Sequence, residues 1–429
     1  MLQLLFYPRR HTSKVASHKV GPTITADTYP TNILWKAELM TKYYLDLPVL
    51  DRTSAVSSYT FSSADIMSAS GVNIGNFAFR HALRFIIKDL LSYTVTRYPA
   101  YLNAARENKV DSVIVSCANW LGTSDADEAA NFNRAAAFEA TDASTVCFGL
   151  GVQAQSGVSF ANLGPNTQRL AKVLAERCNL LSVRDETTQN TLEKFGITNT
   201  VVTGCPSNFI NGNPDLGMNI SATAQELLGR VQSWQGVRAA ICEFSGGNPA
   251  SGRVLQAKLR LLETSPAFYI VQSPTLLPFT MRETREIPAS YLKNNPFGES
   301  VERLRRVLRS KVIYFSSIES WMDFARTCDL SYGMRIHGNM VPLQAGVPSV
   351  LISHDSRTSG LANIMGIPQV SAEDFADNHA KSPLGILEII AEKMQDYDKK
   401  RRGLANVMCD YLQANEIEAH PSILGVAGR

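Results

Sequence analysis

Short apolar, β-rich segments alternate with amphipathic segments along most of the chain from Val72 onward. Residues 111–116 and 144–149 have the apolar, β-branched character of buried strands. Residues 127–139 have helical composition, and residues 168–178 place their apolar side chains on one helical face. This alternation is typical of parallel α/β units.

A third unit of this kind ends just before the part of the chain that is richest in turn-forming residues. The unit consists of a strand at 180–183, a helix at 187–195 and a strand at 200–203. The turn-rich part is 211–220, which we take as a domain boundary. The alternation then restarts, with strands at 237–244, 267–272, 312–315 and 330–331 and helices at 251–263, 300–309 and 318–326. We therefore predict an N-terminal Rossmann-like domain over residues 46–215 and a C-terminal one over residues 216–429, whose last helix could pack back on the first domain.

Residues 1–45 are assigned to a leader or extension of uncertain order. Residues 1–39 lack clear periodicity and carry more basic than acidic side chains, and Met40 could be the native start. A floppy extension is favoured over a transit-like or membrane-surface segment.

Composition narrows the class of protein. The 429 residues are 45% hydrophobic and 19% charged, which excludes disordered, collagenous and coiled-coil chains. A formal net charge of +3 argues against nucleic-acid binding and leaves a local basic pocket open. The seven cysteines are scattered and predict buried reduced thiols. No apolar run approaches the roughly 18 residues of a membrane-spanning helix, so no transmembrane segment and a cytoplasmic protein are expected.

The segment that is most informative about chemistry is 329–353, which is predicted to form a strand, a tight turn, a helix and a second strand. Arg335 and His337 fall at the helix N-terminus, just beyond the carboxyl end of a strand, where open α/β sheets bind ligands. Backbone N–H groups there favour an anion, Arg can grip a phosphate or carboxylate with two hydrogen bonds, and His transfers protons near neutral pH. Pro342 is expected early enough in this helix to be tolerated, and Gly346 to end it. The alternative is a capping Arg and a hydrogen-bonded core His.

Arg184 has the matching position at the end of another predicted strand. It is followed by Asp185, Glu186 and a predicted helix. Judged in isolation, the favoured interpretation is a surface ion pair between Arg184 and one of these two carboxylates.

Together the two segments resemble the polysaccharide pyruvyl transferase family. Its members show a strand ending in V-R-D-E before a helix and a later R-x-H-G or R-x-H-A before A-G-V-P, which stand here at residues 183–186, 335–338 and 345–348. Weaker matches lie at residues 73–76 (N-I-G-N), 204–207 (G-C-P-S), 354–357 (H-D-S-R) and 365–368 (M-G-I-P). The likeness covers roughly residues 65–370.

The resemblance implies an α/β fold similar to GT-B glycosyltransferases, in which two Rossmann-like domains face a cleft that holds the site. It also implies a transferase that moves the pyruvyl group of phosphoenolpyruvate onto two hydroxyls of a sugar, as a ketal, and releases phosphate. The sugar would belong to an exopolysaccharide or another cell-surface glycan. Phosphoenolpyruvate would be the donor substrate, and no cofactor or metal would be needed.

A donor that bears a phosphate and a carboxylate needs about two cationic groups and a proton donor. On this resemblance we expect Arg184 and Arg335 to hold the donor's anions and His337 to act as acid or base, as the three catalytic residues. The expected substrate-binding residues are Ile336, Gly338, Asn339, Arg357, Asn76 and Asn119. Ile336, Gly338 and Asn339 would offer backbone N–H groups. Arg357 stands where relatives often have Lys, which preserves the charge and changes the contact.

The sequence departs from the family where a Gly-rich turn often follows the second strand. Residues 116–120 (S-C-A-N-W) stand there instead, which puts acceptor contacts on that side in doubt. Asn119 and Trp120 could bind sugar, whereas a buried Trp beside a turn is the plainer interpretation. The irregular, Pro-containing residues 274–296 are a candidate acceptor-specific insertion.

Two further motifs are better explained by structure. Residues 149–154 match G-x-G-x-x-A after a strand, but the residues that follow do not read as the helix that a dinucleotide site needs. Asp125 and Asp127 form a D-x-D, but capping of the helix by Ser124 or Asp125 explains them. The histidines show no spacing that suggests a metal site.

Alternatives to the pyruvyl transferase remain. One is a nucleotide-sugar glycosyltransferase of the GT-B type, because an Arg at a helix N-terminus also suits a diphosphate. The other is a non-catalytic glycan-binding relative, since a fold does not prove activity. The sequence leaves open whether the acceptor is lipid-linked, whether the protein associates with the inner face of the membrane, and whether it forms a homo-oligomer.

Overall fold

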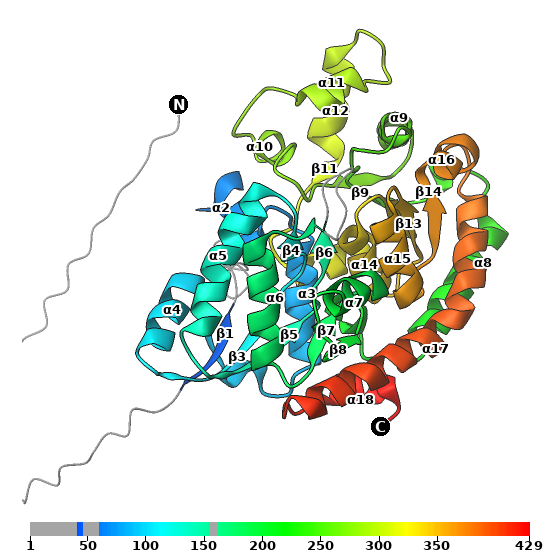
Figure 1. Cartoon of the computed structure of the whole chain (residues 1–429). Coiled ribbons are helices and arrows are strands. Elements are labelled where there is room, and N and C mark those ends of the chain that lie inside the picture. Colours follow the sequence, from blue (N-terminus) through cyan, green and yellow to red (C-terminus); the bar gives the residue numbers. More distant parts are fainter. Residues whose placement is uncertain (1–40, 46–59, 154–161) are drawn as a thin grey trace, which may run out of the picture. The chain divides into compact units, whose positions relative to one another are not determined.

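The computed structural model describes residues 41–45, 60–153 and 162–429, without the side chains of Ser356 and Arg357. The predicted extension at residues 1–39 lies outside the described residues. Figure 1 shows the described part as two parallel sheets with helices packed on them. The predicted α/β class is confirmed.

The first sheet has the strand order β2-β1-β3-β5, and every pair is parallel. The strands are β1 (Thr41–Leu45), β2 (Thr94–Thr96), β3 (Val110–Ser116) and β5 (Ser144–Phe148). Leu45 lies opposite Thr96 and Val115, so these strands end together at one edge of the sheet. Helices α4 (Tyr98–Arg106), α5 (Asp125–Glu139) and α6 (Pro165–Arg177) cover the face turned to the viewer in Figure 1.

Two short parallel pairs accompany this sheet. They are β4 (Leu121–Gly122) with β6 (Val152–Gln153), and β7 (Leu181–Val183) with β8 (Thr200–Val202). A bridge between Leu150 and Val183 connects β7 to the segment that follows β5. The N-terminal helices α2 (Ser63–Ser70) and α3 (Asn76–Ala82) precede β2, and α7 (Glu186–Glu193) lies between β7 and β8.

The second sheet has the order β11-β10-β9-β12-β13-β14 and is also parallel throughout. Its strands are β9 (Ala239–Cys242), β10 (Phe268–Ile270), β11 (Val312–Ile313), β12 (Leu330–Gly333), β13 (Ser349–Ser353) and β14 (Gln369–Ser371). Its helices are α9 (Ser251–Thr264), α10 (Leu277–Thr280), α11 (Ala289–Lys293), α12 (Val301–Lys311), α13 (Ile318–Ala325), α14 (Ile336–Gln344), α15 (Ser356–Met365) and α16 (Ala372–Asp374). All residues of β9 and β12 are buried, as expected for central strands covered on both faces.

The C-terminal helices contact segments from both sheets. Helix α17 (Leu384–Ala414) packs along α8 (Leu216–Arg230) and is followed by α18 (Pro421–Ala427). The Tyr411 hydroxyl donates to the backbone carbonyl of Cys147, and the His420 amide donates to the carbonyl of Ile86 at 2.8 Å. The division into two domains at residue 215 stays a prediction.

Three local features differ from the sequence-based expectation. Residues 41–45, assigned to the extension, form β1 in the middle of the first sheet. The second half of the turn-rich part at 211–220 is the first turn of α8. Pro342 lies in the interior of α14 rather than in its first turn, although Gly346 follows the helix with φ +86° as expected. Of the helices in the described part of the chain, none is both long and apolar enough to span a membrane.

Candidate active site

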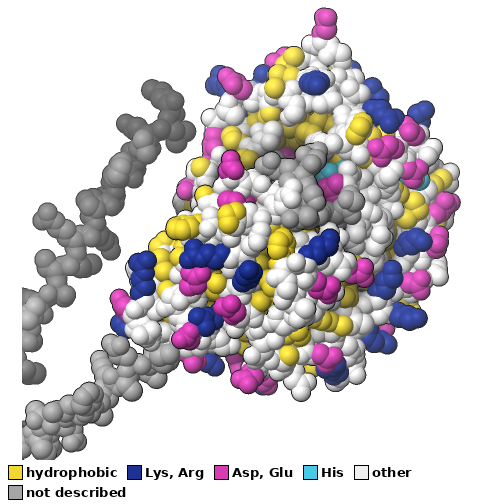
Figure 2. Space-filling view, in the orientation of Figure 1, with side chains coloured by type: hydrophobic (Ala, Val, Ile, Leu, Met, Phe, Trp, Pro, Cys, Tyr) yellow, Lys and Arg dark blue, Asp and Glu magenta, His cyan; other side chains and the backbone are white. Residues whose placement is uncertain are grey.

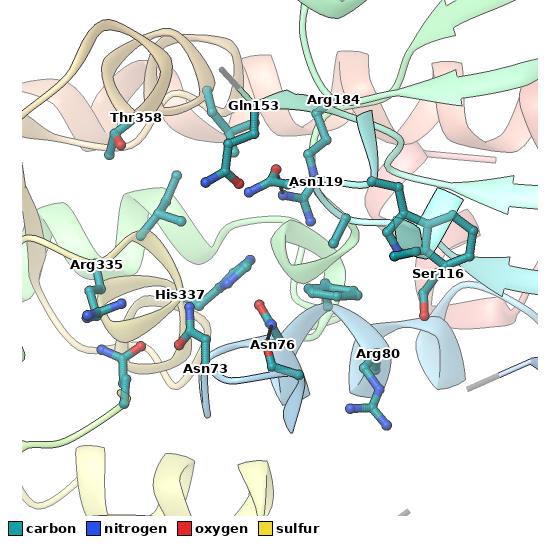
Figure 3. A pocket seen from close by; sticks show the side chains of 18 of the residues that line it. Asn73, Asn76, Arg80, Ser116, Asn119, Gln153, Arg184, Arg335, His337 and Thr358 are labelled. Carbon is teal, nitrogen blue, oxygen red and sulfur yellow. Dashed lines mark hydrogen bonds between the residues drawn. The ribbon is translucent and has the colours of Figure 1, made fainter. Parts of the chain in front are cut away.

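One cavity of about 920 Å³ lies where strand ends from both sheets meet. The first sheet contributes Leu45 at the end of β1 and Ser116 at the end of β3, and the second contributes Gln272 after β10 and residues 334–337 after β12. Figure 3 shows Arg184, Asn119, His337 and Asn76 projecting toward the same space. The cavity therefore has the position that ligands take in parallel α/β sheets, at the carboxyl ends of the strands.

Arg335 is held by a buried carboxylate beneath the cavity. Its Nε lies 3.4 Å from Oε2 of Glu243, whose side chain is 1% exposed. The same carboxylate accepts hydrogen bonds from the backbone N–H groups of Gln272 at 2.9 Å and Ser273 at 2.7 Å. Burial raises the pKa of Glu243, and the charge of Arg335 and these hydrogen bonds oppose the rise. Glu243 thus fixes one side of a guanidinium that lines the cavity.

A second cation lies below this pair. The side chain of Lys258 is fully buried, and its Nζ donates to the carbonyl of Cys242 at 2.9 Å. Burial lowers the pKa of Lys258 to about 8. Cys242 pairs in register with Gly333, the last residue of β12, which places Lys258 close to the N-terminus of α14. The positive charge of Lys258 therefore adds to the positive end of that helix.

His337 lies in the first turn of α14 and is 6% exposed. Its ring packs against Phe79 with the centroids 5.6 Å apart. Its Nε2 lies 3.4 Å from Sγ of Cys205, which also accepts a hydrogen bond from the Ser207 hydroxyl at 3.1 Å. The buried thiol and the Phe79 ring together set the orientation of the imidazole at the wall of the cavity.

Arg184 follows β7 and is 6% exposed. Its Nη1 donates to Oδ1 of Asn119 at 2.9 Å, and its guanidinium carbon lies 5.3 Å from the centroid of the Phe79 ring. Asp185 is the N-cap of α7, where its carboxylate accepts from the amide of Thr188 at 2.7 Å. Because Phe79 contacts both Arg184 and His337, one aromatic ring positions the two candidate catalytic side chains relative to each other.

The turn at Asn73–Asn76 joins the two halves of the site. The amide of Ile74 donates to the carbonyl of Gln272 at 2.8 Å. A Cβ atom on Gly75 would lie 2.7 Å from Oε1 of Gln272 and 2.9 Å from Cβ of His337, so the turn approaches α14 too closely for any other residue. Asn76 lines the cavity while its Nδ2 donates to the carbonyl of Ser70 at 3.0 Å.

The sequence model of polysaccharide pyruvyl transferases matches residues 73–356, more than half of the chain, and the match includes every element of this cavity from the Asn73 turn to α14. The chain belongs to this family. A search of curated proteins finds no match.

Solved structures similar to this polysaccharide pyruvyl transferase family member include Anabaena HepE in complex with UDP. That similarity has a TM-score of 0.39 and 13% identity, over 88% of this chain and 98% of HepE. A UDP-N-acetylglucosamine 2-epimerase from Rickettsia bellii is similar with a TM-score of 0.33 and 10% identity, over 87% and 98% of the two chains.

The structure brings six of the nine residues expected from the family pattern to one cavity. They are Arg184, Arg335, His337, Ile336, Asn76 and Asn119. Gly338 and Asn339 are not among the residues that line it. Gly338 packs on Cys242 and Gln272, and Nδ2 of the Asn339 side chain donates inward to the carbonyl of Gly333 at 2.9 Å. The side chain of Arg357 lies outside the described residues.

The family motifs do not include several side chains that shape the site. Glu243 follows β9 and Gln272 follows β10, and these strands come close to β12 only through the order of strands in the sheet. Phe79 and Arg80 lie on α3. The Gln272 amide is fully buried beside the cavity, and neither of its polar atoms has a hydrogen-bond partner in the described part of the chain. The one sequence signal for Glu243 is a carboxylate that follows the apolar residues 239–242 of the strand predicted at 237–244.

The other motifs have structural explanations. Ser124 and Asp127 form a capping box at the start of α5, as predicted for the D-x-D. The short strand β6 occupies residues 152–153 of the Gly-rich match, where a dinucleotide site would need a helix. All seven cysteines are buried and unbridged. Among the described residues, no group of His, Cys, Asp and Glu side chains is arranged to hold a metal ion.

Proposed function

We propose that this member of a glycan-modifying transferase family transfers the pyruvyl group of phosphoenolpyruvate to two hydroxyls of a sugar. The observation that carries the proposal is the convergence of Arg184, Arg335 and His337 on one cavity, at two strand ends and a helix N-terminus. The N-terminus of α14, where Ile336 and His337 line the cavity, and the two guanidinium groups suit a small donor with a phosphate and a carboxylate.

In the proposed reaction, every proton that is released is taken up again, and the three side chains bind the donor and exchange a proton. A proton is added to the methylene carbon of phosphoenolpyruvate, and one sugar hydroxyl adds to the neighbouring carbon and loses its proton. The phosphate then leaves that carbon and takes up the proton of the second hydroxyl, which closes the ketal. Arg184 and Arg335 hold the donor and stabilise the charge of the leaving phosphate, and His337 exchanges the proton as acid or base.

The test is phosphate release from phosphoenolpyruvate by the purified protein, with a panel of galactose, glucose, mannose and N-acetylmannosamine glycosides. Arg335→Lys keeps a charge beside Glu243 but loses the planar fork, and we expect it to lower kcat/KM by about 100-fold. His337→Gln should lower kcat by a similar factor, because a proton-transfer group contributes roughly 10²- to 10⁴-fold.

The matched control is Arg326→Lys, on the exposed C-terminal end of α13, where the guanidinium pairs with Asp323 at 2.9 Å. This variant should release phosphate like the wild type. Thermal unfolding with phosphoenolpyruvate and, separately, with UDP-glucose measures donor binding without turnover. Stabilisation by UDP-glucose and none by phosphoenolpyruvate would overturn the proposal in favour of a nucleotide-sugar glycosyltransferase.

A further inference from the structure

Gln272 is a polar side chain of the cavity wall to which neither the family pattern nor the proposed reaction gives a role. It follows β10, is fully buried and lines the cavity. Neither its Nε2 nor its Oε1 has a hydrogen-bond partner among the residues that the structure describes. Since buried side-chain amides are nearly always hydrogen-bonded in folded proteins, an amide without a partner in the wall of a cavity needs an explanation.

The backbone of Gln272 is fixed on both sides. Its N–H donates to Oε2 of Glu243 at 2.9 Å, and its carbonyl accepts from the amide of Ile74 at 2.8 Å. The same Oε2 lies 3.4 Å from Nε of Arg335. The position of Gln272 is therefore tied to the carboxylate that holds Arg335 and to the Asn73–Asn76 turn.

Two glycines make room for the Gln272 amide. A Cβ atom on Gly75 would lie 2.7 Å from its Oε1, and a Cβ atom on Gly338 would lie 2.4 Å from its Nε2. Gly75 is the residue before α3 and Gly338 is the third residue of α14, so the amide lies between the starts of these two helices. Figure 3 shows Arg335 and His337 next to each other at the start of α14. The tight fit holds the amide beside these two residues without supplying a partner for its polar atoms.

Gln344, on α14, shows how a glutamine is accommodated away from the cavity. It is also fully buried but is not among the residues that line the cavity. Its Oε1 accepts from the amide of Asn211 at 2.9 Å, and its Nε2 donates to the hydroxyl of Tyr397 at 2.9 Å. An unpaired buried amide destabilises a protein, and a ligand that pairs with it offsets this cost. The contrast with Gln344 therefore connects the unpaired amide of Gln272 with the cavity.

The chemistry of the amide limits what Gln272 can bind. A carboxamide offers two N–H donors and one carbonyl acceptor. The N–H groups of Nε2 can donate to a carboxylate or phosphate oxygen, whereas Oε1 can pair only with a group that carries a proton, such as a sugar hydroxyl. Because the amide is neutral, it adds a hydrogen bond to an anion beside Arg335 without placing a second cation there.

The surface around the cavity offers no comparable means of binding the donor. On the face seen in Figure 2, Lys and Arg side chains are interspersed with Asp and Glu side chains, and the described residues form no broad patch of one sign. The fields of neighbouring opposite charges cancel at a distance, so such a face attracts an anion weakly. Recognition of the donor therefore depends on the groups that line the cavity.

We propose that Gln272 is a donor-binding residue, and that its Nε2 donates a hydrogen bond to the carboxylate or the phosphate of phosphoenolpyruvate. This inference rests on the proposed function, because it takes phosphoenolpyruvate as the donor that Arg335 holds. It adds to the two arginines a neutral side chain that recognises the donor by the direction of a hydrogen bond.

The first experiment measures the binding of phosphoenolpyruvate to Gln272→Met by titration calorimetry, without an acceptor. Met keeps the length of the side chain and removes both polar groups. We expect the affinity to fall by at least about tenfold relative to the wild type, which corresponds to the loss of one hydrogen bond to a charged group. Without ligand, the Tm of this variant should equal or exceed that of the wild type, because no hydrogen bond within the protein is lost.

The matched control is Gln344→Met. It removes the partner of the Asn211 amide and the donor to the Tyr397 hydroxyl, so its Tm should fall below that of the wild type. At a temperature where it is folded, it should bind phosphoenolpyruvate as the wild type does. Unchanged phosphoenolpyruvate binding in Gln272→Met would overturn the inference. A fall in its Tm as large as that of Gln344→Met would also overturn it, because the amide would then have a partner within the protein.

Inorganic phosphate, titrated into the wild type and Gln272→Met, identifies the anion that Nε2 binds. Weaker phosphate binding in the variant assigns Nε2 to the phosphate of the donor. Unchanged phosphate binding, together with weaker phosphoenolpyruvate binding, assigns it to the carboxylate.

Failure of the proposed function gives a different result from failure of this inference. A wild-type protein that binds UDP-glucose and not phosphoenolpyruvate would overturn the donor, and with it the ligand assigned to Gln272. A wild type and a Gln272→Met variant that bind phosphoenolpyruvate equally would overturn the role of Gln272 alone.

Discussion

Glu243 orients Arg335 without contact with the cavity. Its carboxylate accepts from the backbone of Gln272, whose carbonyl in turn accepts from Ile74 in the Asn73–Asn76 turn. One buried carboxylate therefore fixes both the guanidinium that we assign to the donor and the turn that faces it. Glu243 is a positioning residue, because it acts on the donor only through Arg335.

Glu243→Gln should raise the KM for phosphoenolpyruvate by about tenfold while kcat falls less, since the variant keeps the shape and loses the charge that holds Arg335. Steady-state kinetics with donor and acceptor varied separately measures this split. Glu286→Gln, at an exposed carboxylate, is the matched control and should change neither constant. A tenfold fall in kcat with an unchanged KM for phosphoenolpyruvate would contradict the positioning role.

For single residues, the sequence predicts the candidate catalytic side chains that follow strands. It misses the buried side chains that hold them in place. Arg335, His337 and Arg184 could be found because each lies between the end of a strand and the first turn of the next helix, a relation that is local in the chain. Glu243 could not, because its relation to Arg335 depends on the pairing of β9 with β12, which places Cys242 opposite Gly333. Sheet order is a property of tertiary structure, and periodicity does not contain it.

Among the elements, α3 and α14 show how closely the two sides of the site approach each other. Both begin at the cavity, and Gly75, the residue before α3, leaves no room for a Cβ atom against Gln272 and His337. The distance between the two helix N-termini is therefore set by the absence of a side chain.

Gly75→Ala should lower kcat/KM by about tenfold or more, because the turn must move away from His337. The matched control is Gly229→Ala within α8, where a Cβ atom would meet nothing within 4 Å. That variant should keep full activity and gain about 0.5–1 kcal/mol of unfolding free energy from helix propensity. Kinetics and urea unfolding of both variants test this, and equal activity of the two would refute the close approach.

The elements that the sequence misses are those whose stability comes from distant partners. β1 is a short strand preceded by an aperiodic segment, and it forms because β2 and β3 pair with it on both sides. The first turn of α8 contains turn-forming residues and is helical because the Asp398 carboxylate, on α17, accepts from the amides of Gly217 at 2.7 Å and Met218 at 2.9 Å. A cap supplied by another helix leaves no local signal.

In the molecule as a whole, α17 supports segments that lie far apart in the sequence. Arg401 is fully buried and donates to the backbone carbonyls of Asn208 at 2.9 Å, Asn213 at 2.7 Å and Asn211. The segment that it holds continues directly from Cys205, whose thiol contacts His337. A residue of the C-terminal helix therefore supports the shell behind the candidate catalytic histidine.

Arg401→Met should lower the free energy of unfolding by about 3 kcal/mol or more, because three buried carbonyls lose a charged donor together. Arg402→Met, at the exposed neighbouring position, should change it by no more than about 0.5 kcal/mol. Urea denaturation followed by far-UV circular dichroism measures both. Equal midpoints for the two variants would contradict the supporting role of Arg401.

The bonds from Tyr411 and His420 to Cys147 and Ile86 also have a consequence for biosynthesis. β5 and residues 83–86 are translated well before their partners, which are Tyr411, packed on Phe148, and the residues of α18. Folding from the N-terminus during synthesis cannot finish the packing behind the candidate site before α17 is made, so we expect an intermediate with exposed apolar surface. Production of this enzyme should therefore depend on chaperones that bind such surfaces until translation has passed His420.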